Sequence, residues 1–65
     1  MNFIITLLKE AKESKQTVAV ITEEGTASYK NYGIVKEISE TDILMEKHDG
    51  KKSAIRISNI VKVED

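Results

Sequence analysis

The centre of the chain carries the stretch YKNYGIVKEI at residues 29–38. Within it, Ile34, Lys36 and Ile38 occupy alternate positions, a period of two that is typical of a β-strand with one buried face. Gly33 interrupts the run, and a glycine inside a strand often marks a bulge or a sharp bend. We therefore predict a long strand over residues 29–38 that bends near Gly33 and serves two faces of a small barrel.

Further strands are indicated on both sides of this stretch. β-branched and apolar residues, alone or alternating with polar ones, are typical of strands. They recur at residues 17–22, 43–47, 53–57 and 60–63. Asp49 and Gly50 form a dipeptide that strongly favours a two-residue hairpin turn. The pattern therefore predicts five short strands, and the sequence has no proline that would contradict any of them.

An amphipathic helix is predicted ahead of the strands, over residues 3–14. Asn2 precedes it and belongs to the residue types favoured as helix N-caps. The apolar stripe of the helix must pack on another element, most simply on one open end of a sheet or barrel. The apolar residues recur at helical spacing, at Ile4, Leu7, Leu8 and Ala11.

The element order predicts a mainly β fold, in which an N-terminal α-helix precedes a five-stranded, strongly bent SH3-like barrel. The rival is an open sheet with the helix packed on one face, but a barrel leaves fewer strand edges and Gly33 supplies a bend. The 65 residues allow a single domain over positions 1–65. A domain this small buries only about 60% of its unfolded surface. Because the chain has no cysteine for a disulfide, oligomerisation is the remaining usual source of stability.

The composition argues against an enzyme. The single histidine, His48, lies in a predicted hairpin turn, and the absence of cysteine removes both thiol nucleophiles and thiolate zinc sites. The three glycines are too far apart for a phosphate-binding loop. We therefore expect no catalytic residue, no metal and no cofactor. The apolar run at residues 3–8 is far shorter than the roughly 20 residues of a membrane span, so we expect a cytoplasmic protein without a secretory signal.

Two clusters have the residue types that contact nucleic acid. Tyr29, Lys30 and Tyr32 combine a positive charge with aromatic rings on which bases stack. In a strand the two tyrosines lie on opposite faces, and the alternative places one in the core and one at a loop or subunit contact. Lys51 and Lys52 form a basic pair, for which the alternative is a solvated hairpin end.

The central stretch also resembles a known sequence motif. Residues 33–38, GIVKEI, resemble the Gly-x-Leu/Val-x-x-Phe segment in the first motif of the Sm-like proteins. Residues 43–45 match the strand that follows in that family, most closely in bacterial Hfq, and residues 55–63, IRISNIVKV, resemble the second motif apart from its glycine. The resemblance spans nearly the whole chain and implies an Sm-like barrel.

This resemblance implies a homo-oligomeric ring that binds RNA. Arg56 would face the central pore and stack on a base, with Asn59 as a second contact, whereas the alternative for Arg56 is an outward side chain paired with a carboxylate such as Glu46. The Asp and Asn that hold a base in the family are replaced by Ser39 and Ile43, which implies an atypical base pocket. Sm-like subunits join through their fourth and fifth strands, so the implied interface residues are Ile55, Ile57, Ile60, Val61 and Val63.

The distribution of charge is consistent with two classes of function. Residues 17–50 carry three lysines and seven acids, whereas residues 51–65 carry four basic residues and two acids. A ring would repeat the basic segment in every subunit, which favours RNA binding through phosphate contacts. The acidic middle and the net charge of −1 favour instead an SH3-like protein-interaction module that offers an open strand edge to a protein partner. A purely structural oligomer is a third alternative.

Overall fold

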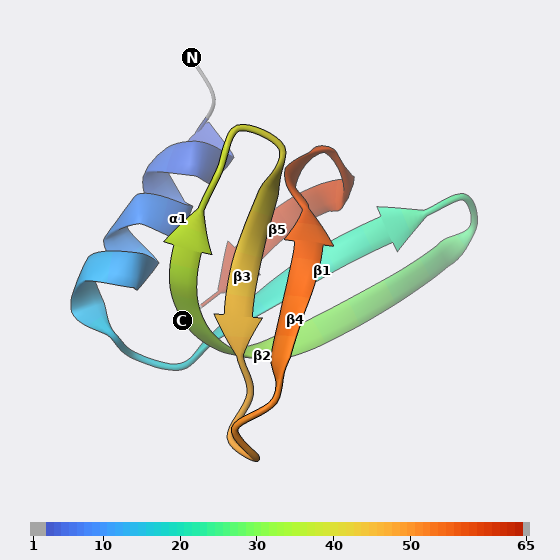
Figure 1. Ribbon diagram of the computed structural model, residues 1–65. Coiled ribbons are helices and arrows are strands. Elements are labelled where there is room, and N and C mark those ends of the chain that lie inside the picture. The colour runs from blue at the N-terminus through green and yellow to red at the C-terminus, as the bar shows by residue number, and fades with distance from the viewer. Residues whose placement is uncertain (1–2, 65) are drawn as a thin grey trace.

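The computed structural model describes residues 3–64 and shows one helix followed by five strands (Figure 1). Asn2, the expected N-cap, lies outside the described residues. A short 3-10 helix, η1 (Ile57–Asn59), links the last two strands. The other elements are α1 (Phe3–Ser14), β1 (Val18–Glu24), β2 (Ala27–Ile38), β3 (Asp42–Glu46), β4 (Lys52–Arg56) and β5 (Ile60–Glu64). This order confirms the predicted helix and five strands.

The strands form one antiparallel sheet in the order β4-β3-β2-β1-β5. β2 is the long central strand, and its first part pairs with β1 while its second part pairs with β3. The change of partner occurs at Gly33, which pairs with Val18, whereas the next residue, Ile34, pairs with Glu46. The sheet curls as β2 passes from one partner to the other (Figure 1). This confirms the predicted strongly bent sheet.

Gly33 is required because β3 approaches its backbone closely. A β-carbon at this position would lie 2.6 Å from the carbonyl oxygen of Glu46, well inside van der Waals contact. The irregularity in the pairing of β2 with β3 lies further along, between Val35 and Glu37. Gly33 therefore provides room for the neighbouring strand, and the pairing irregularity is a separate feature of β2.

We expect Gly33→Ala to lower the free energy of unfolding by about 1–3 kcal/mol, the usual cost of forcing extra volume into a packed site. The added methyl group meets backbone atoms of Glu46, which cannot rotate away as a side chain would. Urea unfolding followed by circular dichroism measures the change. Ser28→Ala, an exposed position on the same strand, is the control and should cost little. A Gly33→Ala variant as stable as the parent would contradict the close approach.

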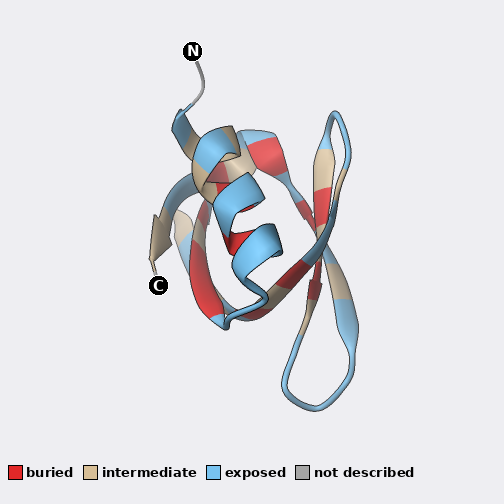
Figure 2. Cartoon of the chain, turned by 90° about the vertical axis from the view of Figure 1, so that its left-hand side faces the viewer, coloured by how far each residue is buried: buried red, intermediate tan, exposed pale blue. Residues whose placement is uncertain are grey.

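The hydrophobic core lies between α1 and the inner face of the curled sheet (Figure 2). Leu8 and Ala11 come from the buried side of the helix, and Leu8 is completely inaccessible to solvent. The helix packs against β2 and β5, so it covers one side of the core. The strands and η1 contribute the rest of the buried cluster: Val18, Val20, Val35, Ile43, Met45, Ile55, Ile57 and Ile60.

The strand ends differ from the predicted ones in two informative places. β1 and β2 stay paired out to Glu24 and Ala27, with the turn made by Gly25 in the left-handed region (φ 62°) and the residue after it. The prediction ended β1 at residue 22 because acidic side chains follow, but backbone pairing holds these exposed residues in the strand. Ile57 belongs to η1 rather than β4, because its N–H donates to the Thr41 carbonyl at 2.8 Å. The remaining ends coincide or shift by one residue.

Candidate nucleic-acid interface

An open cleft of about 680 Å³ lies between the β1–β2 hairpin and the end of β4. One wall comes from the hairpin, through Thr22, Glu24, Tyr29 and Asn31. The opposite wall comes from the edge of β4, the start of β3 and η1, through Asp42, Ser53, Ala54, Ile55, Arg56, Ser58 and Asn59. Three residues predicted to contact RNA, Tyr29, Arg56 and Asn59, thus line one cleft.

The register of the hairpin sets the polar wall of this cleft. Thr22 pairs with Tyr29, and alternate residues along each strand point to the same face. Glu24 and Asn31 therefore share that face, and Asn31 donates its side-chain amide to the carbonyl of Val20 at 3.2 Å. Tyr29 is 51% exposed, so its ring is available to a ligand. The wall presents an aromatic ring flanked by polar side chains.

Arg56 stands on the opposite wall and pairs with a carboxylate across the sheet, as the alternative expected, but this carboxylate is Asp42 and not the example Glu46. The register of β3 with β4 places Asp42 directly opposite Arg56, whereas Glu46 lies opposite Lys52. The Arg56 Nε atom is 4.0 Å from Asp42 Oδ1, and both side chains are well exposed. An exposed pair at this distance contributes little to stability, so the guanidinium remains free to take another partner.

Arg56 also borders a second depression, formed with the β2–β3 turn and η1. This depression is lined by Glu40, Thr41, Ile57 and Ser58 besides Arg56. The arginine therefore stands on the ridge between two hollows of the surface. Of the residues predicted to contact RNA, Arg56 lines both the cleft and this depression.

Tyr32 and Lys30 lie away from the cleft. The Lys30 Nζ atom is 5.7 Å from the centroid of the Tyr32 ring, within the range of a cation–π contact. Tyr32 is 56% exposed and borders a depression with His48, on the side of the β3–β4 turn. Neither tyrosine is in the core, so the alternative of one buried tyrosine is wrong. The two rings border different hollows and do not form one stacking platform.

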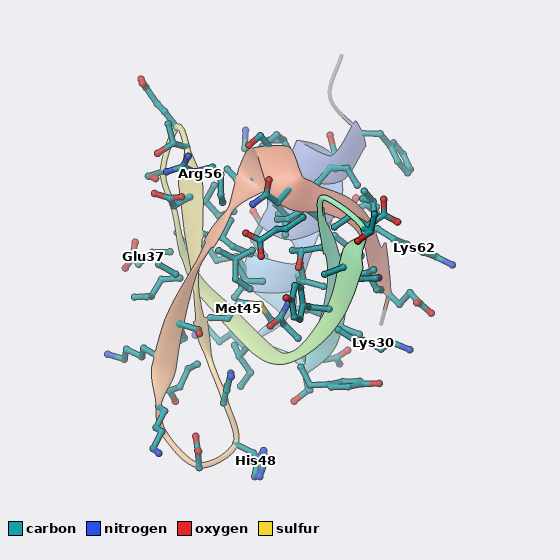
Figure 3. All side chains as sticks on the ribbon, turned by 90° about the vertical axis from the view of Figure 1, so that its right-hand side faces the viewer. Lys30, Glu37, Met45, His48, Arg56 and Lys62 are labelled. Atoms are coloured by element: carbon teal, nitrogen blue, oxygen red, sulfur yellow. The ribbon has the colours of Figure 1, made fainter. Side chains whose placement is uncertain are left out.

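Lys51 and Lys52 lie at the β3–β4 turn, at the opposite end of β4 from Arg56. Figure 3 shows the same separation, with Arg56 at one end of the molecule and His48 of that turn at the other. Lys52 shares a hollow with three further lysines that were not predicted to contact RNA, Lys12, Lys15 and Lys36. The pairing of β2, β3 and β4 brings Lys36 near Lys52, and the position of α1 beside the sheet adds Lys12 and Lys15.

The residues expected at a subunit interface have two different environments. Ile55, Ile57 and Ile60 are 7–9% exposed and belong to the core of the chain itself. Val61 is 50% exposed, and Val63 is half-buried at the end of β5. β4 and β5 are the two edge strands of the sheet. Within one chain, therefore, Val61 and Val63 are the expected interface residues that retain accessible apolar surface.

Residues 3–64 contain no group of three His, Cys, Asp or Glu side chains placed to hold a metal ion. The same residues include no helix with the length and apolar character needed to cross a membrane.

The helix and the bent five-stranded antiparallel sheet define an Sm-like fold. A crystal structure of Hfq, described as a pleiotropic translational regulator, is similar to this chain with a TM-score of 0.78. The similarity covers 98% of this chain and 100% of the Hfq chain, at 17% sequence identity. No protein-family model matches the chain, and no curated protein matches it. The structure thus confirms the Sm-like, Hfq-type fold that the motif resemblance implied.

Proposed function

We propose that this chain is a non-enzymatic, cytoplasmic Sm-like protein that assembles into a homo-oligomeric ring and binds RNA through an atypical base pocket. The observation that carries the proposal is the cleft that brings Tyr29, Arg56 and Asn59 together on an Sm-like fold. An exposed aromatic ring and an arginine are the groups on which single-stranded bases stack. Stacking of a base on either group requires no cofactor.

The two open edges of the sheet support assembly into a ring. β4 and β5 lie at opposite ends of the strand order, so each presents an edge that a neighbouring chain can extend. Joining the β5 edge of one copy to the β4 edge of the next is a heterologous contact, which closes into a ring when the rotation between copies allows it. Val61 and Val63 would add apolar contact at that joint.

The residues at the family's base-holding positions support an atypical pocket. The Ser39 hydroxyl donates to the Asp42 carbonyl at 3.0 Å and accepts from the Asp42 N–H at 3.1 Å, so it closes the β2–β3 turn. Ile43 is 1% exposed and belongs to the core. Neither side chain is placed to hold a base. We infer that the cleft of Tyr29, Arg56 and Asn59 takes over that role.

Arg56→Ala tests this proposal. We expect the variant to bind single-stranded RNA about fivefold or more weakly, because it loses a stacking and phosphate-binding group worth about 1 kcal/mol or more. Fluorescence anisotropy with labelled RNA measures the affinity, and native mass spectrometry should show unchanged assembly. Lys9→Ala, which removes one exposed positive charge from α1, is the matched control.

Unchanged RNA binding by Arg56→Ala would refute a role for Arg56 as a contact. Binding that disappears at modest salt in the parent protein would favour the second candidate, a protein-interaction module. The observation behind that candidate is the same pair of open edges, since an edge strand also accepts an extended peptide from another protein.

A further inference from the structure

Resting on the proposed RNA binding, we propose that the cleft between the β1–β2 hairpin and Arg56 selects guanine, with Tyr29 stacking on the base and the Glu24 carboxylate accepting hydrogen bonds from its Watson–Crick edge. The selectivity comes from the mixture of charges in the cleft. A basic groove alone would bind phosphate without regard to sequence. This cleft places carboxylates beside a guanidinium.

Guanine is the base whose two edges match this mixture. Its Watson–Crick edge presents adjacent donors, the N1–H and the N2 amino group, which suit the two oxygens of one carboxylate. Its other edge presents the O6 and N7 acceptors, for which arginine is the usual partner. Uracil has one N–H donor between two carbonyl acceptors, and in adenine and cytosine the amino group adjoins a ring-nitrogen acceptor. A carboxylate meets repulsion from an acceptor in each of those three bases.

The hairpin places the acceptor and the stacking ring on one surface. Tyr29 lies opposite Thr22 and diagonal to Glu24 on the same face, about 7–8 Å apart between backbones. That spacing lets a base on the Tyr29 ring extend its edge towards the carboxylate. Within residues 3–64 the Glu24 carboxylate has no hydrogen-bond or ion-pair partner. It is therefore a free acceptor in the cleft.

The other polar groups are consistent with this arrangement. The Asn31 side chain lines the cleft, and its amide nitrogen already donates to the Val20 carbonyl. Among residues 3–64 the Arg56 side chain is held only by the exposed 4.0 Å pair with Asp42, so it can turn to the O6 and N7 edge. Ser53 and Ile55 lie within the β4 edge that the proposed ring covers, whereas Arg56 is the last residue of β4 and directly precedes η1. The inference therefore uses only the hairpin face and Arg56.

Inosine provides a direct test, because it differs from guanosine only by the missing N2 amino group. We compare a short single-stranded RNA of adenosines carrying isolated guanosines with the same RNA carrying inosines, using fluorescence anisotropy on the assembled protein. We expect the guanosine RNA to bind at least about tenfold more tightly, the effect of one hydrogen bond to a charged acceptor. In Glu24→Gln the two affinities should differ by less than about twofold.

Glu23→Gln is the matched control. Glu23 is the exposed neighbour of Glu24 on the opposite face of β1, so this variant loses the same charge but should keep the guanosine preference. Equal and measurable binding of both RNAs by the parent protein would overturn guanine selection and leave RNA binding intact. A full preference retained by Glu24→Gln would also overturn it. Failure of both RNAs to bind would refute the proposed function together with this inference.

Discussion

Leu8→Ala should lower the free energy of unfolding by about 2–5 kcal/mol, the range found when a large buried aliphatic side chain is cut to alanine. Leu8 is completely buried and is the residue through which α1 fills the core. The core of a domain this small rarely supplies more than about 3–5 kcal/mol. The variant is therefore expected to be largely unfolded unless assembly stabilises it. Urea unfolding at several protein concentrations measures both contributions.

Phe3→Ala is the matched control for this experiment. Phe3 lies on the same helix and is also large and apolar, but it is 69% exposed. Its removal should change stability by less than about 0.5 kcal/mol, as is usual for surface positions. If Leu8→Ala were no more destabilising than Phe3→Ala, the packing of α1 on the sheet would be wrong.

Val61→Glu should dissociate the proposed ring into single chains while leaving each chain folded. Val61 is half-exposed within one chain, so a charge there costs the monomer little. At a joint between β5 and the next copy's β4 the same carboxylate becomes a buried, unpaired charge, at a cost of about 3–5 kcal/mol per contact. Because a ring repeats that contact in every subunit, the assembly should be lost. Native mass spectrometry on protein purified without nuclease measures the mass of the complex.

Phe3→Glu is the control for assembly, because it places the same charge on an exposed apolar residue away from both strand edges. It should assemble as the parent does. A Val61→Glu variant that still forms the parent complex would place the joint elsewhere. A parent protein that is a bare monomer or dimer would remove the ring and favour the protein-interaction module.

Much of the fold is predictable from short-range pattern. The apolar period of residues 3–14 matches α1 to the residue, and alternation located five strands in order. The same alternation cannot fix the register of two paired strands, because every register offers the same backbone groups. The sequence therefore allows Arg56 a carboxylate across the sheet such as Glu46, and the register of β3 with β4 determines that this carboxylate is Asp42.

The interface prediction shows a related difficulty. Ile55, Ile57 and Ile60 are apolar residues in or beside edge strands, and their sequence is the same whether they pack within one chain or between two. The curl of the sheet turns them inward, so they join the core of the chain. Val61 faces outward, because neighbouring residues of a strand point to opposite faces.

The candidate site is likewise predictable only in part from the sequence. Residue type alone indicates Tyr29, since bases stack on aromatic rings, whereas Arg56 and Asn59 are implied by the resemblance of residues 55–63 to the second Sm-like motif. Their meeting in one cleft, and the presence of Glu24 among them, depends on β2 changing partner at Gly33 and on the hairpin then facing the end of β4.

Helix period, strand alternation and turn chemistry are local properties, so the sequence alone is enough to predict the elements and their order. Strand register and the closure of a bent sheet are contacts between distant residues, and for this reason only the folded chain defines the cleft.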